Sequence, residues 1–408
     1  MLNKIGYAAI FISILIIIGL LTKHESQVAV REEYDLLYNR LARDEMKGHD
    51  LIAVNAKHSY PMANAWIASS AAKMYINTNN KNYLMYSLRE TEWLITNSDL
   101  DNDGILGWGL PVEIPTSWGS YPKDHEYQIT SLFRIIGLLD TYDVLKDSLH
   151  IQKEKILQTS RKVIEGIIGQ NCLTIHDDDT VSIWYSCSEE DETYDATNVN
   201  AMMVGVLSRL SKLKMFENTE YNEVSNKIAQ RLLKNKIVRG DAWLWFYRND
   251  SEYKKYIQDL VHSGFTAHGL LMYRENQEGA VFIDKDKVLK AFKLYRDNGN
   301  NNYKRFIDEI FEPRVWDVAF NLFILANYGD LISTENLDNE FQKLIKYKDS
   351  NGYYSFEHND IRVFIRAQAA VLLSLSAYYQ YLSYRPWYMF LYDYIHLTSS
   401  HAGNATIY

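Results

Sequence analysis

Two kinds of helical pattern alternate along most of the chain. The first is apolar on nearly every side, which is typical of a buried helix, and the second keeps polar residues on one side, as a helix facing water does. Apolar helices are expected at 61–75, 127–145, 195–213, 264–273, 315–328 and 364–382, and the amphipathic helices that follow them at 81–97, 149–168, 221–235, 285–297, 334–347 and 387–397. The pattern therefore predicts six helical hairpins in a row, in an all-α body.

Alternating buried and exposed helices can close a ring with the apolar helices inside. Two local phrases accompany the pattern: DNDGILGWGLP at 101–111 and DATNVNAMMVGVL at 195–207. Together they resemble the (α/α)6 toroid, the six-hairpin superfamily of glycosidases, polysaccharide lyases and sugar epimerases. The resemblance implies a toroid domain over residues 55–408 that acts on a carbohydrate.

The first 25 residues contain a nearly unbroken apolar run, 5–21, between Lys4 and Lys23. This length is near the lower limit for a membrane-spanning helix and the upper limit for the core of a signal peptide. We expect an uncleaved transmembrane signal anchor at 1–25, followed by an amphipathic helical spacer at 26–54. The protein is then a single-pass protein of the cell membrane with its body in the periplasm or outside the cell. A cleaved signal peptide and a cytoplasmic body are the alternatives.

The links between the expected helices fall into two groups. Links inside hairpins are short, whereas links between hairpins are long: 98–126, 170–194, 236–263, 298–314 and 348–363. Each long link leads into the N-terminus of an inner helix, so all of them are expected on one face of the ring. Helix N-termini carry free N–H groups and partial positive charge. This face is therefore predicted to form a cleft for an anionic or hydroxyl-rich ligand.

Carboxylates near the starts of inner helices are the candidates for catalysis, because glycosidases use two carboxyl groups, one protonated and one ionised. Asp124 and Glu126 precede the second inner helix, Asp195 begins the third, and Asp317 lies in the first turn of the fifth. We predict these four as the catalytic residues. The alternative is that each aspartate only caps its helix.

Aromatic, amide and arginine side chains near the same face are predicted to bind substrate. Tryptophan offers a large ring for stacking, and an arginine can hold a uronate carboxylate with two bonds. The predicted substrate-binding residues are Trp108, Trp118, Tyr127, Asn198, Trp243, Arg314, Trp316 and Tyr354. The alternatives are that the rings anchor the loops and that the arginine pairs with a local carboxylate.

Asp99, Asp101 and Asp103 are spaced like the first half of a calcium-binding loop, and Gly104 allows the bend. The twelfth position of that loop is Leu110 rather than a glutamate, so the segment is not an EF-hand. We predict a structural calcium site here, with a solvated turn as the alternative. The reaction itself is expected to require no cofactor.

The chain has only two cysteines, Cys172 and Cys187, in two strand-like arms that flank the turn HDDDT at 176–180. A hairpin centred on Asp179 and Thr180 would place the cysteines opposite each other, so export predicts a disulfide between them. The net charge of −9 and the lack of a basic stripe argue against a nucleic-acid partner.

The predicted function is that of a membrane-anchored, extracytoplasmic enzyme that hydrolyses glycosidic bonds of a polysaccharide. A uronate epimerase or polysaccharide lyase is the second hypothesis, and it needs a base near C5 of the sugar. Side chains available for that role are His58, Tyr60, His125, Tyr127, His262, His268 and Tyr354. The third hypothesis is a non-catalytic toroid that binds glycan as a scaffold for polysaccharide synthesis or export.

Overall fold

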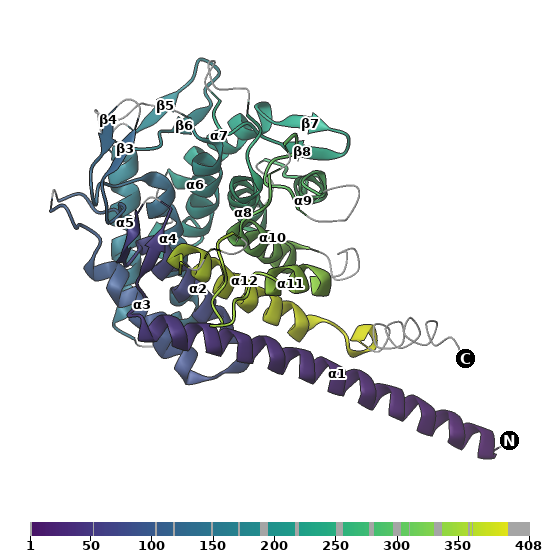
Figure 1. Ribbon diagram of the computed structural model, residues 1–408. Coiled ribbons are helices and arrows are strands. Elements are labelled where there is room, and N and C mark those ends of the chain that lie inside the picture. Colours follow the sequence, from purple (N-terminus) through teal and green to yellow (C-terminus); the bar gives the residue numbers. More distant parts are fainter. Residues whose placement is uncertain are drawn as a thin grey trace.

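A computed structural model describes residues 2–51, 53–102, 104–116, 119–147, 150–169, 172–187, 195–216, 220–249, 256–276, 281–296, 303–309, 311–329, 337–357, 360 and 362–390. Within these residues, the inner helices are α2 (Pro61–Thr78), α4 (Gln128–Leu145), α6 (Thr197–Leu210), α8 (Leu260–Asn276), α10 (Val315–Tyr328) and α12 (Ile365–Tyr384). Each packs against the next, and α12 packs against α2, so the ring closes (Figure 1). The predicted all-α toroid is confirmed.

The outer layer of the ring is formed by the more polar helices. Among the described residues these are α3 (Lys81–Thr96), α5 (Gln152–Gly169), α7 (Tyr221–Lys234), α9 (Lys285–Leu294) and α11 (Leu337–Ile345), with a short 3-10 turn at Lys214–Phe216. Each packs on the inner helix that precedes it. The polar side of each outer helix faces water, which is why the amphipathic pattern identified them.

The N-terminal helix α1 (Leu2–Arg43) also belongs to the toroid. Its second half packs against α12 beside α3 (Figure 1), and Tyr34, Leu37 and Leu41 are fully buried there. The Tyr34 hydroxyl lies 2.9 Å from the Ser70 hydroxyl of α2. The sequence placed the start of the toroid domain at residue 55, whereas much of the expected spacer, 26–54, packs in the outer layer as the outer helix of the sixth hairpin. The helix expected there, 387–397, is helical at 387–390, and the rest lies outside the described residues.

Small residues let two pairs of inner helices approach closely. A Cβ atom added at Gly269 of α8 would lie 2.0 Å from the carbonyl oxygen of Ala201 in α6. A Cβ atom added at Gly137 of α4 would lie 2.6 Å from the carbonyl oxygen of Ala65 in α2. Side chains larger than hydrogen at these glycines would push the helices apart.

Aromatic side chains fill the axis of the ring. Trp66, Phe133, Phe265 and Phe320 come from α2, α4, α8 and α10, and their ring centroids lie 4.7–6.2 Å apart. Towards the C-terminal ends of the inner helices, the Arg209 guanidinium pairs with Asp140 at 2.6 Å. The axis of the ring is therefore filled by side chains rather than open as a channel among the described residues.

Short antiparallel hairpins lie at the end of the ring where the inner helices begin. They are β1 (Gly48–Asp50) with β2 (Ala53–His58), β3 (Ile114–Thr116) with β4 (Gly119–Tyr121), β5 (Leu173–Ile175) with β6 (Val181–Ile183), and β7 (Ile237–Arg239) with β8 (Ala242–Leu244). Each lies in a link that precedes an inner helix, and Figure 1 shows three of the pairs gathered at one end.

Backbone hydrogen bonds join consecutive long links around the ring. The N–H groups of Gln128, Thr197, Leu260, Val315 and His49 donate to the carbonyl oxygens of Tyr185, Tyr247, Arg305, Phe356 and Val363, respectively, at 2.8–3.0 Å. Each bond connects one link, or the helix start that follows it, to a neighbouring link. The expectation that the long links share one face is confirmed. We call this the loop face, and the opposite end, where the short links lie, the short-link face.

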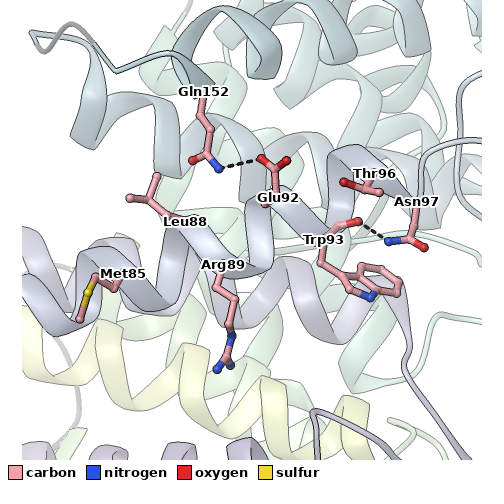
Figure 2. Close-up of a pocket in the computed structure, with 8 residues that line it drawn as sticks. All are labelled: Met85, Leu88, Arg89, Glu92, Trp93, Thr96, Asn97 and Gln152. Atoms are coloured by element: carbon pink, nitrogen blue, oxygen red, sulfur yellow. Dashed lines mark hydrogen bonds between the residues drawn. The ribbon is translucent and has the colours of Figure 1, made fainter.

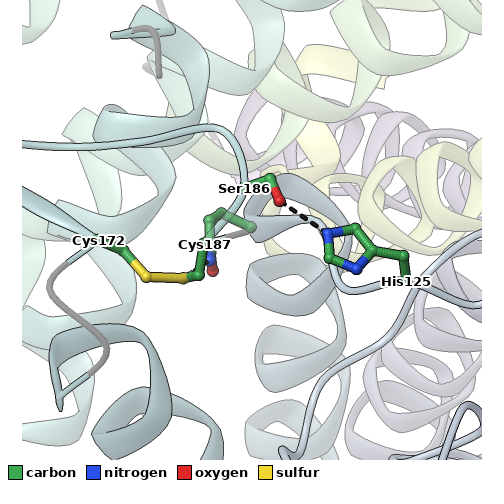
Figure 3. The surroundings of a disulfide bond; sticks show 5 residues. His125, Cys172, Ser186 and Cys187 are labelled. Carbon is green, nitrogen blue, oxygen red and sulfur yellow. Dashed lines mark hydrogen bonds between the residues drawn. A yellow bond between two sulfur atoms is a disulfide. The ribbon is translucent and has the colours of Figure 1, made fainter. Parts of the chain in front are cut away.

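Cys172 and Cys187 form a disulfide at the base of the β5–β6 hairpin (Figure 3). The predicted bond is confirmed, but the predicted register is wrong, because Leu173 pairs with Ile183 and Ile175 with Val181. The turn is centred on Asp178 rather than between Asp179 and Thr180, and Cys187 lies beyond the end of the paired strands.

Candidate active site at the loop face

Asp259 and His262 form a pair at the start of α8. Asp259 immediately precedes the helix, and its carboxylate accepts hydrogen bonds from the His262 backbone N–H at 3.0 Å and from Nδ1 of the His262 ring at 2.5 Å. The Arg305 guanidinium lies 3.8 Å from the other carboxylate oxygen. Burial acts to raise the pKa of Asp259, but His262 and Arg305 outweigh it and hold that pKa below its usual value. Asp259 is therefore ionised at neutral pH.

Asp317 lies in the first turn of the next inner helix, α10. It is 0% exposed, and burial together with the nearby charge of Asp259 raises its pKa to about 7. One carboxyl oxygen accepts the Arg314 backbone N–H at 2.7 Å as part of a capping box. The other oxygen is buried and has no hydrogen-bond partner among the described residues. Two neighbouring carboxyl groups thus have pKa values displaced in opposite directions, which is how acid and base roles are separated in active sites.

The His262 side chain connects this pair to the surface. It is 30% exposed, and its ring lies against Tyr247 and Phe265, with centroids 4.9 and 5.7 Å away. Because Nδ1 of the ring is hydrogen-bonded to Asp259, Nε2 is the ring nitrogen that is left to exchange a proton with a ligand. This is the arrangement of a histidine base held by a carboxylate.

Of the four predicted catalytic carboxylates, Asp317 is the one that lies beside a carboxyl group of opposite protonation. Asp195 is fully engaged in holding the start of α6: it pairs with Arg231 at 2.8 Å and accepts hydrogen bonds from the Asn200 and Asn249 amides at 3.0 and 3.2 Å. The Asp195 carboxylate thus already binds a cation and two amides, and its catalytic role stays a prediction.

Asp124 and Glu126 lie two residues apart on the segment that leads into α4. The Asp124 backbone N–H donates to the Leu110 carbonyl at 2.7 Å, and Lys123 lies 3.5 Å from its carboxylate. The Glu126 side chain packs over Gly107, where an added Cβ atom would lie 2.1 Å from Glu126 Cγ. This segment therefore runs along 107–110. Their catalytic roles stay predictions.

Three of the predicted stacking or binding rings are buried by packing. Trp108 is 1% exposed and donates its indole N–H to the Leu94 carbonyl at 3.0 Å. Tyr354 is fully buried and donates its hydroxyl to Glu33 of α1 at 2.8 Å. Trp243 is buried beneath the lysines Lys236 and Lys287. These rings have no open face for a sugar, because packing against helices and lysine side chains covers them. Trp118, like the predicted calcium ligand Asp103, lies outside the described residues.

The other predicted binding residues lie at or beside the starts of inner helices. Tyr127 and Asn198 are buried at the starts of α4 and α6. Trp316 is partly exposed at the start of α10. The Arg314 guanidinium pairs with Glu357 at 3.1 Å, which is the local salt bridge that was the alternative to uronate binding.

Arg366 and Asp50 form an ion pair that the sequence pattern did not identify. Arg366 is the second residue of α12, and two of its nitrogens bond the two oxygens of Asp50 from β1. Its guanidinium lies 5.8 Å from the Tyr60 ring and 5.5 Å from the Trp316 ring. Burial acts to lower the pKa of Arg366, but Asp50 raises it overall, so the group stays charged. No sequence signal joins residues 316 positions apart.

Asp101, His125 and Glu126 place one ligand atom each within 4.8 Å of the others. This set shares Asp101 with the predicted calcium loop and takes its other members from the segment before α4. The His125 ring nitrogen Nε2 lies 2.9 Å from the Ser186 hydroxyl (Figure 3). Two carboxylates and an imidazole are a donor set for a divalent cation, and the calcium site over Asp99, Asp101 and Asp103 stays a prediction.

An apolar groove of about 590 Å³ lies on the outer surface of α3 and the start of α5 (Figure 2). Met85, Leu88 and Trp93 line it, and the Gln152 amide closes one side with a 2.8 Å hydrogen bond to Glu92. The groove lies outside the ring, so it is separate from the carboxyl pair at the loop face.

No protein-family model and no curated protein matches the sequence. Solved structures match the fold. One is an inactive variant of an α-1,6-mannanase, GH76A of Salegentibacter sp., in complex with α-1,6-mannotetrose. It is 13% identical with a TM-score of 0.60, and the match covers 87% of this chain and 99% of the mannanase. A polysaccharide lyase is 13% identical with a TM-score of 0.58, covering 88% and 99%. A sugar epimerase from a ruminal bacterium is 12% identical with a TM-score of 0.58, covering 86% and 98%. The chain therefore has the same α/α toroid fold as these carbohydrate-active enzymes, which is the fold that the sequence resemblance implied.

Proposed function

We propose that this protein is a membrane-anchored, extracytoplasmic enzyme that hydrolyses glycosidic bonds of a polysaccharide at the loop face. One observation carries the proposal: Asp317 has a pKa of about 7 beside Asp259, whose pKa lies below its usual value. Glycoside hydrolysis needs one protonated and one ionised carboxyl group on the two sides of the scissile bond. The toroids of similar fold include an α-1,6-mannanase, which is consistent with such chemistry.

In this mechanism Asp317 donates its proton to the leaving glycosidic oxygen as the bond from that oxygen to the anomeric carbon breaks. Asp259, together with His262, takes a proton from a water molecule as that water forms the new bond to the anomeric carbon. The proton from water moves to Nε2 of His262, whose Nδ1–H stays bonded to the Asp259 carboxylate. Hydrolysis thus leaves Asp317 ionised and His262 protonated, and a proton must return to Asp317 before the next turnover. Asp317 must become accessible when substrate binds, because its carboxyl group is buried in the structure described here.

The Asp259–His262 pair also supports the second hypothesis, a uronate lyase or epimerase. A histidine held by a carboxylate can remove the C5 proton of a uronate, and the charged Arg366 beside Tyr60 and Trp316 offers a cation at the same face. In a lyase the C5 carbanion expels the C4 glycosidic oxygen, whereas in an epimerase the proton returns to the opposite side of C5.

The membrane anchor is the part of the proposal that concerns α1. In the described residues, Ile10–Arg43 is the one helix long and apolar enough to cross a membrane. Ile10, Phe11, Ile12, Ile14, Ile17, Leu20 and Leu21 are exposed on it. So many exposed apolar side chains are unusual on a helix that faces water, whereas lipid chains would cover them in a bilayer.

The test is an assay of the full-length protein in detergent against a panel of neutral and uronate-containing polysaccharides. New reducing ends, the ultraviolet absorbance of unsaturated uronate, and exchange of solvent deuterium into C5 are measured together. The variants are Asp317→Asn, Asp259→Asn and His262→Gln. Asp308→Asn is the matched control, because Asp308 is an exposed acid that pairs with Arg239 in the links of the same face.

Reducing ends without absorbance, lost in Asp317→Asn and Asp259→Asn but kept in Asp308→Asn, are the expected result. Absorbance that disappears in His262→Gln would instead establish a lyase, and deuterium at C5 without cleavage would establish an epimerase. Binding of a polysaccharide with none of the three signals would reject an enzyme and favour a glycan-binding scaffold.

A further inference from the structure

The anchor helix is rigidly joined to the toroid at the point where the two separate. The Lys23 ammonium donates to the carbonyl oxygens of Ser383 and Arg385 at 2.8 and 2.9 Å, at the C-terminal end of α12. The Gln27 amide donates to the Ser383 hydroxyl at 3.1 Å. Helix α1 is continuous through this junction, so the toroid does not hang on a flexible tether. The direction of the apolar half of α1 therefore fixes the orientation of the whole ring.

The chain that follows α12 turns back onto the apolar half of α1. A Cβ atom added at Gly19 would lie 2.7 Å from the backbone oxygen of Trp387 and 2.9 Å from its indole ring. Gly19 lies inside the apolar run 5–21, one helical turn before Lys23. Tyr388 packs edge-on against Trp387, and Tyr384 lies just before the turn. Tryptophan and tyrosine are enriched where membrane and water meet, so this aromatic segment lies at the level where α1 leaves the bilayer.

Exposed apolar side chains extend from this segment across the short-link face. Ile76, Ile151, Met215 and Phe282 are all exposed, and each lies in or beside a different short link of the ring. Since the links are spread around the ring, these side chains form a broad apolar rim rather than one local patch. Isolated exposed apolar residues are ordinary on a soluble surface, but here they lie at the same end as the exit of the apolar helix.

We propose that the short-link face rests on the lipid bilayer, so that the loop face opens away from the membrane. Lys23 and Arg43 mark the two ends of the toroid along α1, which places the cleft about 30 Å above the lipid surface at 1.5 Å per residue. The occupant of the apolar rim is the lipid surface, because the rim is continuous with the helix that enters it. This inference rests on the membrane anchor of the proposed function.

The experiment uses full-length protein in liposomes that contain brominated lipid, with an environment-sensitive fluorophore on a single introduced cysteine. The two native cysteines are bonded to each other, so the introduced thiol alone is labelled. Two matched pairs compare the faces. Ile151→Cys on the short-link face is 74% exposed and Ile175→Cys at the loop face is 73% exposed. Tyr384→Cys is 63% exposed and Tyr256→Cys at the loop face is 64% exposed.

We expect brominated lipid to cause a loss of fluorescence at residues 151 and 384 and none at residues 175 and 256. Equal signals within either pair would overturn the inference, whether both labels are quenched or neither is. Flotation of the same liposomes separates this from the anchor itself. Protein that floats with the lipid but shows equal signals refutes only the orientation, whereas protein that stays in the soluble fraction refutes the anchor and the orientation together.

Discussion

The raised pKa of Asp317 makes a quantitative prediction about stability. Between about pH 4 and pH 7, Asp317 keeps its proton in the folded protein and has lost it in the unfolded chain, whose carboxyl group titrates near 3.8. The unfolded state therefore binds fewer protons in this window, and the free energy of unfolding falls as pH rises. The raised pKa of Asp317 therefore adds most to the free energy of unfolding below the pKa of the unfolded chain. This contribution is lost as pH rises toward 7.

The expected size follows from the displacement of the pKa. Each pH unit in which the folded and unfolded states differ by one proton changes the free energy of unfolding by about 1.4 kcal/mol. From 3.8 to about 7 the loss sums to about 4 kcal/mol. Asp317→Asn keeps an acceptor for the Arg314 N–H but does not titrate, so the variant should gain stability relative to the native protein by about this amount between pH 4 and pH 8.

The measurement is urea unfolding of both full-length proteins in the same detergent, at half-unit steps from pH 4 to pH 8. The difference between the two free energies is plotted against pH, which cancels groups that titrate identically in both proteins. Asp308→Asn serves as the control, because Asp308 is an exposed acid of the same face. A flat line for Asp317→Asn would mean that Asp317 is already ionised at pH 5, and it could then not act as the proton donor.

Three further predictions concern the scaffold. Asp195→Ala should lower the free energy of unfolding by about 3 kcal/mol, because it leaves the largely buried Arg231 without its partner. Urea denaturation measures this loss, and an activity assay on the folded variant should show unchanged turnover per folded molecule. Replacing Cys172 and Cys187 by serine should cost about 3 kcal/mol, the expectation for a loop of 15 residues, and reduction of the native protein should have the same effect in the same unfolding assay. Gly269→Ala should lower the free energy of unfolding by about 1–3 kcal/mol through overpacking. Gly169→Ala has open space around its Cβ position and should be nearly neutral or stabilising in thermal unfolding. Equal effects of the two substitutions would contradict the close contact between α6 and α8.

Much of the architecture could be predicted because it depends on local pattern. A helix buried on all sides must be apolar on all sides, so the periodicity of apolar residues in the sequence predicts which helices are inner and which are outer. Link length then gives the face, since every long link ends at the start of an inner helix. The disulfide followed from two cysteines in neighbouring arms, although the register of the hairpin did not.

The candidate site depended on the tertiary structure. In the sequence, Asp259 and Asp317 look like ordinary residues at helix starts. The structure places the two carboxyl groups near each other, and their pKa values then move in opposite directions. Asp50 meets Arg366 because the ring closes its first link onto its last helix. Trp108 is as prominent in the sequence as a binding residue would be, yet packing covers it.

The role of α1 divides in the same way. The sequence by itself determined that the chain begins with an apolar helix followed by a polar one, because hydrophobicity and period are properties of the segment. Only the tertiary structure decided that the polar half completes the outer layer of the ring, since that depends on which surface α12 leaves uncovered. Side-chain pKa values, ion pairs and buried rings are likewise set by neighbours that are distant in sequence, and a linear pattern contains no information about those distances.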